Sequence, residues 1–485
     1  MRSGIINGAA SATLFAIMLA IVSSPAHADL MIQNVTIIDP VAGETENQDI
    51  LIGNGIIAAI GERGSIATFA PVDSLDGTGK FLIPALWDAH VHLTFDKEIG
   101  NAALPLFVAN GITRVRDTGG LLSEILLVQD VAKERGPEAP VIYFAGPLID
   151  GIPRVYDGTP ARFPNISDGA STPEDAERLV DELTAAGASL IKSYEMLKPD
   201  VFRALIARAT ERKLPVTSHI PLSMDAKAVV AAGVRGMEHL RNIGLSCSDK
   251  ADTLLTERQT MLREGVKEEG STLRSSIHAA QRPIAFGSQD AERCGALIKA
   301  LGDAQVFQTP TLALNTRGAF RQFLEPRQRE PFEHLPRAAR DRWNRFADDA
   351  AETSIDPAYV AFADWSLGMV NQLHEAGVPI MAGTDTPIGL LTPGFSLHLE
   401  METLVRAGLS PQEALASATL RPAQFFGLEE KMGTIEVGKS SELVLLTANP
   451  LEDIANTRTV DTVITRGFVL DRTKLDDMLE NAAPE

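Results

Sequence analysis

The chain has 485 residues, which is longer than one compact domain usually is. Of these residues 45% are hydrophobic and 22% charged, which is the ordinary composition of a globular protein. Its 64 Asp and Glu outnumber 44 Lys and Arg, so the net charge is −20. Because nucleic acids and anionic membranes repel a negative surface, we expect neither as a partner. A small-molecule substrate is compatible with this charge, and self-association into a homo-oligomer is left open.

The first 28 residues have the pattern of a cleaved secretory signal. Arg2 precedes an apolar run from Ala12 to Val22, which is shorter than the roughly 20 residues that span a bilayer. Ala26 and Ala28 then form a small-x-small cleavage pattern. We therefore favour export over a membrane anchor, with a mature start near Asp29 and a periplasmic or secreted location. Since no later run is long and apolar enough to span a bilayer, we expect no membrane contact after signal removal.

Both ends of the remaining chain are rich in predicted β-strands. After position 29 the segment LMIQNVTIIDP alternates, and Asn54-Gly55 separates two apolar runs, which is a hairpin signal. A similar strand-like pattern occurs near the end of the chain, in GTIEVGKSSELVLLTANP and TVDTVITRGFVLD. We predict one small β domain, built from residues 29–80 and 431–485, with residues 81–430 inserted between its halves.

The inserted middle alternates short apolar strands with amphipathic helices, which predicts a parallel sheet. Thr172 before Pro173 is a typical helix start, and Gly187 is a typical stop. Eight strands are expected, as a (β/α)₈ barrel requires; a doubly wound sheet is the alternative. The segments that predict them are PALWDAHVH, GITRVRD, APVIYFAG, ASLIKSY, LPVTSHI, VRGMEHL, AQVFQTPTLAL and VPIMAGTD.

Two longer excursions interrupt this alternation, at residues 149–171 and 246–300. In a barrel both follow the carboxyl ends of strands, so we expect them to form walls of a substrate pocket. The two cysteines, Cys247 and Cys294, both fall in the second excursion. A disulfide is permitted in an exported protein and is slightly favoured here over two buried thiols.

Polar side chains follow several of the predicted strands. His90 and His92 are two apart, so they face the same side of their strand. A single strand histidine is usually a packed core residue, but a metal satisfies two buried imidazoles together. The ends of other strands carry Lys192, His219, His239 and Asp385. Taken singly each has an ordinary structural explanation, whereas their joint convergence predicts a divalent metal site, most simply zinc.

With these segments in view, the chain resembles the metal-dependent amidohydrolase superfamily. The resemblance rests on DAHVH, GITRVRDTGG, GASLIKSY, VTSHI, GMEHL, AGTDT and the tail from LSPQEALASATLRPAQFF to SSELVLL. It covers nearly the whole mature length and is closest to the prolidase-like branch with a carboxylated strand-four lysine. It implies a (β/α)₈ TIM barrel beside a β-sandwich made from both termini, and a centre of two divalent metal ions.

Residue by residue, the resemblance implies that His90 and His92 bind one metal and that His219 and His239 bind the second. Lys192 matches the lysine that is modified to N6-carboxylysine and bridges both ions, and Asp385 matches the strand-eight aspartate. The implied mechanism is attack by a metal-held hydroxide on a polarised carbonyl, with Asp385 shuttling the proton to the leaving amine.

Other polar residues have weaker assignments. Tyr194, two residues after Lys192, is a candidate for binding the oxyanion or substrate carboxylate, although a packed tyrosine at the rim is about as consistent with the sequence. Arg241 is a candidate for an anionic substrate group, with a structural salt bridge favoured. Arg116 and Asp117 are expected in a structural ion pair or loop anchor. The histidines expected at surface or packing positions are His278, His334, His374 and His398.

These residues predict an exported binuclear hydrolase that cleaves an amide bond, of the dipeptide or N-acyl amino acid type. The same centre would also suit esters, lactones, carbamates or phosphotriesters. A catalytically silent periplasmic binding protein is a less favoured alternative, because all six ligand-type residues are present. A closed, purely structural metal site is a further alternative.

Overall fold

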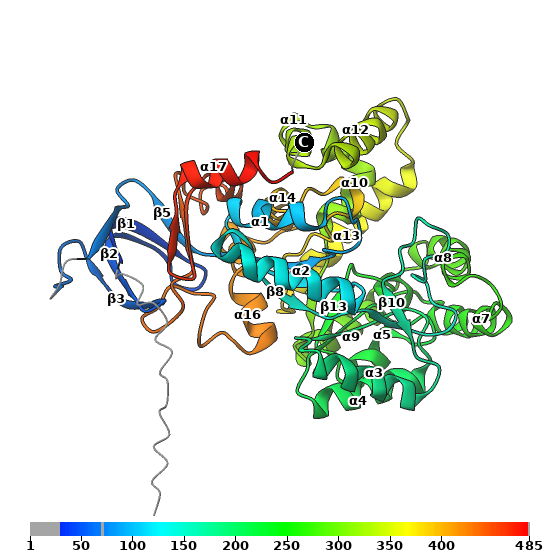
Figure 1. Ribbon diagram of the computed structural model, residues 1–485. Coiled ribbons are helices and arrows are strands. Elements are labelled where there is room, and N and C mark those ends of the chain that lie inside the picture. Colours follow the sequence, from blue (N-terminus) through cyan, green and yellow to red (C-terminus); the bar gives the residue numbers. More distant parts are fainter. Residues whose placement is uncertain (1–29, 69–71, 484–485) are drawn as a thin grey trace, which may run out of the picture.

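The computed structural model describes residues 30–68 and 72–483 (Figure 1). The predicted signal peptide at residues 1–28 lies outside the described residues. Within the described ranges, none of the helices is both long and apolar enough to cross a bilayer.

Strands from both ends of the chain share one sheet, which lies to one side of the molecule (Figure 1). Its order is β17-β16-β15-β5-β1-β2-β3, and β4 pairs with β1. The central strand β5 runs parallel to β1 and antiparallel to β15, so it joins the two halves. The strands are β1 (Leu30–Asp39), β2 (Gly43–Gly53), β3 (Ile56–Glu62), β4 (Asp73–Asp76), β5 (Phe81–Pro84), β15 (Leu443–Leu446), β16 (Val460–Thr465) and β17 (Phe468–Leu470).

The predicted hairpin is present between β2 and β3, which pair antiparallel. Asn54 and Gly55 have φ values of 52° and 76°, which are the left-handed conformations that a tight two-residue turn requires. Ile50 and Ile57 on the two strands are fully buried and pack in the core of this sheet. The burial of these side chains and the Asn-Gly turn therefore specify the same pairing register for β2 and β3.

The middle of the chain forms two parallel sheets. The first has the order β6-β7-β8 and the second β10-β9-β11-β12-β13-β14. Two parallel bridges, Gln308 with Ile380 and Val91 with Thr386, attach the predicted eighth strand to β14 and β6, although it forms no full strand of its own. The strands are β6 (Leu86–Val91), β7 (Ile112–Asp117), β8 (Val141–Phe144), β9 (Leu148–Asp150), β10 (Ser167–Gly169), β11 (Ile191–Ser193), β12 (Val216–Ser218), β13 (Gly236–Glu238) and β14 (Phe307–Thr309).

Helices follow most of these strands, as predicted. In α3, Thr172 accepts the backbone N–H of Asp175, whose carboxylate accepts from Thr172, so the predicted start is a capping box. The helices are α1 (Ala103–Ala109), α2 (Leu122–Arg135), α3 (Pro173–Ala185), α4 (Pro199–Glu211), α5 (Ala226–Ala231), α6 (Ile243–Ser246), α7 (Ala251–Glu264), α8 (Gly270–Phe286), α9 (Ala291–Asp303), α10 (Leu312–Phe320), α11 (Pro326–Arg329), α12 (Arg337–Ala351), α13 (Pro357–Glu375), α14 (Phe395–Arg406), α15 (Pro411–Ser417), α16 (Leu420–Phe426) and α17 (Arg472–Glu480).

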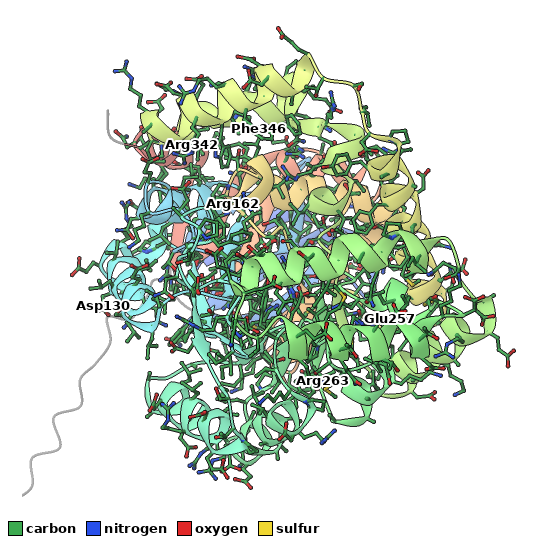
Figure 2. All side chains as sticks on the ribbon, turned by 90° about the vertical axis from the view of Figure 1, so that its right-hand side faces the viewer. Asp130, Arg162, Glu257, Arg263, Arg342 and Phe346 are labelled. Atoms are coloured by element: carbon green, nitrogen blue, oxygen red, sulfur yellow. A yellow bond between two sulfur atoms is a disulfide. The ribbon has the colours of Figure 1, made fainter. Side chains whose placement is uncertain are left out.

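Figure 2 labels a residue of each excursion on one face of the molecule, Arg162 of the first and Glu257 of α7 in the second. Cys247, which caps α6, forms a disulfide with Cys294 in α9 across a sequence separation of 47. The bond therefore closes the second excursion, which contains α7 and α8, into a covalent loop.

We expect this disulfide to stabilise the fold by limiting the freedom of the unfolded chain. For a loop of this length, reduction should lower the free energy of unfolding by about 4 kcal/mol, measured by urea unfolding with and without dithiothreitol. A double Cys247→Ser, Cys294→Ser variant serves as the control and should be as unstable as the reduced protein, with no response to dithiothreitol. Equal stability of the oxidised and reduced wild type would contradict this expectation.

Candidate metal centre

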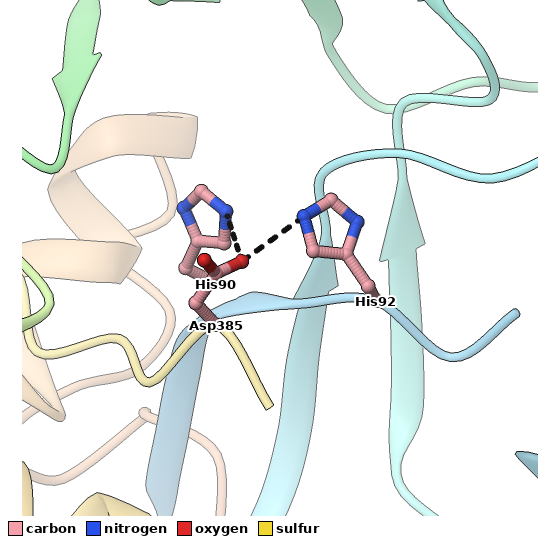
Figure 3. A group of neighbouring side chains, drawn as sticks. All are labelled: His90, His92 and Asp385. Atoms are coloured by element: carbon pink, nitrogen blue, oxygen red, sulfur yellow. Dashed lines mark ion pairs between the residues drawn. The ribbon is translucent and has the colours of Figure 1, made fainter. Parts of the chain in front are cut away.

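His90 and His92 lie where β6 ends. Successive strand residues alternate in direction, so these two side chains project to the same side. His90 is fully buried and His92 is nearly so. Their Nε2 atoms lie 3.2 Å and 3.1 Å from the same oxygen, Oδ1 of Asp385, as Figure 3 shows.

The other predicted ligand residues border the same space. Lys192 lies within β11, and His219 and His239 follow directly after β12 and β13. The ring of His239 lies 4.5 Å from that of His90 and 4.9 Å from that of His219, measured between centroids. The structure thus brings all six side chains to one cavity of about 440 Å³.

Hydrogen bonds fix the direction in which each imidazole faces. His92 donates from Nδ1 to the carbonyl of Gly119 over 2.8 Å, and since a carbonyl only accepts, Nε2 of a neutral His92 carries a lone pair. The other three rings are also held at Nδ1, so each presents Nε2 as well. Their partners are Glu238 at 2.7 Å for His90, Glu195 at 2.9 Å for His219, and the Thr311 hydroxyl at 2.7 Å for His239.

With neutral rings, this arrangement places electron-pair acceptors against one another. Among the described residues, His90 Nε2 and Asp385 Oδ1 are buried without a hydrogen-bond partner. Neutral imidazoles holding lone pairs 3.1–3.2 Å from a carboxylate oxygen repel it, and a cation between them removes that repulsion. His90, His92 and Asp385 are also close enough together to bind one ion. Imidazole nitrogen and carboxylate oxygen are suitable ligands for a divalent metal such as zinc.

Lys192 occupies an unusual position for a lysine. It is 1% exposed, and within the described part of the chain its Nζ has no hydrogen-bond partner. Burial lowers the pKa of Lys192 to about 8. Burial therefore makes the neutral amine more accessible than in an exposed lysine, although the charges of Glu238 and Asp385 partly oppose the shift.

The backbone at two of these positions adopts the left-handed region. φ is 59° at His239 and 65° at Asp385. Such conformations are costly for residues other than glycine and are concentrated at functional sites. His239 directly follows β13 and Asp385 directly precedes the bridge residue Thr386, and both side chains line the cavity.

Two buried glutamates that the sequence analysis did not identify hold the site together. Glu238, in β13, accepts from His90 and from the Arg116 guanidinium, which lies 2.8 Å away. Asp117 accepts the backbone N–H of Leu93 over 2.7 Å. Arg116 therefore forms a structural ion pair and Asp117 anchors a loop, as expected. In the sequence, only the position of Glu238 directly before His239 could have indicated its role. Strand alternation argued against that role, because adjacent residues on a strand usually face opposite sides.

Glu195 is the second of these carboxylates. Besides His219 it binds Arg274 at 2.9 Å and His278 at 2.7 Å, and both of these come from α8. Although burial opposes ionisation, Arg274 and His278 hold the pKa of Glu195 well below its usual range. His278, expected at a surface or packing position, is buried, and its contact with Glu195 also links the second excursion to the centre. Because α8 lies about 80 positions later in the sequence, no local pattern could indicate this contact.

The predicted substrate-binding residues both line the cavity. The ring of Tyr194 lies 4.4 Å from that of His219. Arg241 lies 3.7 Å from Glu195, so it forms an ion pair while its side chain stays 24% exposed. The excursions contribute Tyr156 and Arg282 among other lining residues, so both form pocket walls as predicted.

Comparisons with known proteins agree with this geometry. The family model described as "Amidohydrolase family" matches residues 367–470, which include Asp385. An imidazolonepropionase from Geobacillus kaustophilus (strain HTA426) is 23% identical over 83% of this chain and 84% of its own length. A dihydroorotase from Pelotomaculum thermopropionicum (strain DSM 13744 / JCM 10971 / SI) is 25% identical over 86% of this chain and 88% of its own.

The fold is also similar to that of a solved dipeptidase structure. A solved structure of a Xaa-Pro dipeptidase with methionine bound in its active site superposes with a TM-score of 0.66 at 19% identity. The match covers 92% of this chain and all of that one. The chain therefore carries an amidohydrolase-family segment at residues 367–470, and over most of its length it is similar to an imidazolonepropionase and a dihydroorotase.

Proposed function

We propose that this chain is an exported hydrolase that carries two divalent metal ions, most simply zinc, and cleaves an amide bond in a dipeptide or N-acyl amino acid. The observation that carries the proposal is the convergence of four Nε2 atoms, the Asp385 carboxylate and the unpartnered Lys192 amine on one cavity. A closed structural metal site would not need a cavity of about 440 Å³ beside its ligands.

We further propose that the two parallel sheets are arcs of one (β/α)₈ barrel and that the sheet from both termini folds as a β-sandwich. The bridges from β14 to Ile380 and from Thr386 to Val91 support closure on one side. On the other side, the backbone N–H of Ser189, shortly before β11, donates to the Phe144 carbonyl of β8 over 2.9 Å. In this arrangement the ligand residues occupy the carboxyl ends of the strands, where barrel active sites lie.

In the proposed centre, His90 and His92 hold one ion and His219 and His239 the other, with Lys192 and Asp385 completing the ligands. When bound, such ions polarise a substrate carbonyl and make water nucleophilic at neutral pH. Asp385 accepts the proton from the attacking water and delivers it to the leaving amine. Tyr194, beside His219, is placed to donate its hydroxyl to the developing oxyanion or to a substrate carboxylate.

The lowered pKa gives Lys192 a chemical role in this proposal. A neutral lysine amine adds to carbon dioxide, forming an N–C bond and releasing a proton, and the product is a carbamate anion with two oxygens. That anion replaces an unpartnered ammonium with a group able to bind two cations. The low pKa, about 8, keeps part of the amine neutral and reactive near neutral pH.

The first test is hydrolysis of a substrate panel by zinc-loaded protein, in which we expect dipeptides or N-acyl amino acids to be cleaved. Treatment with a chelator should abolish this activity, and added zinc should restore it. If the amides are inert while esters, lactones, carbamates or phosphotriesters are turned over, the amide assignment is wrong. Tight binding of an amide without any turnover would favour a binding protein instead.

Asp385→Asn tests the proton transfer. The amide keeps the shape of the carboxylate but cannot accept the proton, so kcat should fall by roughly 10²- to 10⁴-fold. The matched control is Asp252→Asn, which removes a carboxylate paired with Arg293 on α9 and absent from the cavity lining. Unchanged kcat in Asp385→Asn would refute the role of this residue as the proton shuttle.

Lys192→Ala tests the carbamate. Removing this side chain should abolish activity, and short carboxylic acids such as formate or acetate should restore part of it by supplying the missing anionic oxygens. Lys192→Gln, which fills the space, should not respond to these acids. A Lys192→Ala variant that stays fully active, or that is restored by methylamine and not by carboxylic acids, would contradict a carbamate.

A further inference from the structure

One wall of the cavity carries more positive charge than its own residues neutralise. Arg241, Arg274 and Arg282 all line this wall, the last two from α8. Among the described residues, Glu195 is the carboxylate that pairs with two of them: it binds Arg274 at 2.9 Å and lies 3.7 Å from Arg241. Three guanidinium groups therefore lie beside one carboxylate.

Arg282 is the least compensated of the three. In the described part of the chain it forms no hydrogen bond and no ion pair within 4 Å, although its side chain is half-buried. Burial and the neighbouring Arg241 lower the pKa of Arg282 to about 9. A partly desolvated cation without a partner is costly, and a ligand anion would remove that cost.

Nearby aromatic contacts place this wall beside the reacting centre. The Arg274 guanidinium lies 6.0 Å from the centroid of the Tyr194 ring, and Tyr194 in turn lies against His219. A substrate group held by the three arginines is therefore adjacent to the proposed metal ligands. Phe346 and Tyr359 line the outer rim of the same cavity and are 51% and 56% exposed, which provides an apolar surface for the remainder of the substrate.

We propose that the leaving portion of the substrate is an acidic amino acid, glutamate or aspartate, whose two carboxylates bind to the wall formed by Arg241, Arg274 and Arg282. This inference rests on the proposed amide hydrolysis. Two substrate carboxylates and Glu195 together carry three negative charges, which balance the three guanidinium groups. An arginine can also bind a carboxylate through two hydrogen bonds. An acidic residue has both carboxylates free when its amine forms the scissile amide, so it must be the part that leaves.

The test measures product binding, which does not depend on turnover. Isothermal titration of the zinc-loaded protein should show L-glutamate binding roughly tenfold to a hundredfold more tightly than its neutral isostere L-glutamine, the effect of one charge-assisted contact. N-acetyl-L-glutamate should exceed N-acetyl-L-glutamine in kcat/KM by a similar ratio. Equal binding of the two products would overturn the inference.

Variants identify the residue responsible. Arg282→Gln should reduce the glutamate-to-glutamine ratio towards one, and Arg282→Lys should retain part of it. The matched control is Arg293→Gln on α9, a guanidinium paired with Asp252 away from the cavity lining, and it should keep the wild-type ratio. An unchanged ratio in a folded Arg282→Gln variant would refute the assignment. If glutamate binds selectively but no amide is hydrolysed, the proposed function fails while the acidic subsite stands.

Discussion

The centre of this molecule depends on one electrostatic constraint: several lone-pair acceptors face one another in a buried space. Nδ1 of His92 must donate to the Gly119 carbonyl, and the other three imidazoles are held at the same atom. Their Nε2 atoms and the Asp385 carboxylate therefore meet without a proton among them when the rings are neutral. A positive charge satisfies all of them together, and divalent cations are the species for which such a set of ligands is suited.

The surrounding structure maintains this arrangement with charge. Glu238 lies between His90 and Arg116, and Glu195 lies between His219 and α8. Each carboxylate orients an imidazole of the proposed centre and is itself paired with an arginine, so these imidazoles are held without leaving a buried anion uncompensated. The disulfide between Cys247 and Cys294 closes the excursion that contributes Arg274 and His278. The disulfide thereby joins α6 and α9, which lie at the two ends of this excursion.

Much of this could be predicted from sequence because the relevant signals are local. The spacing of His90 and His92, the Asn54-Gly55 hairpin and the capping box at Thr172 each depend on a few neighbouring residues and fixed backbone periodicities. The convergence of Lys192, His219, His239 and Asp385 followed from the rule that parallel strands end at one edge. The resemblance to a known superfamily added the roles of these residues.

What the sequence did not indicate depends on contacts between distant segments. Glu195 meets His278 across 83 positions, and Glu238 meets Arg116 across 122. Arg282 resembles any other arginine of a charged helix until the fold turns it towards the cavity. His278 is a buried helix residue, one of the two environments expected for it, but its contact with Glu195 could not be predicted for the same reason. Side-chain partners in three dimensions, and not local patterns, decide these roles.

The most direct test of this account is the metal content of the purified protein, measured by inductively coupled plasma mass spectrometry. We expect two divalent ions per chain in the wild type, with zinc as the main element. A double His90→Ala, His92→Ala variant that remains folded should retain fewer ions. A wild-type protein that binds no divalent metal above trace levels, even after incubation with zinc, would contradict the central claim.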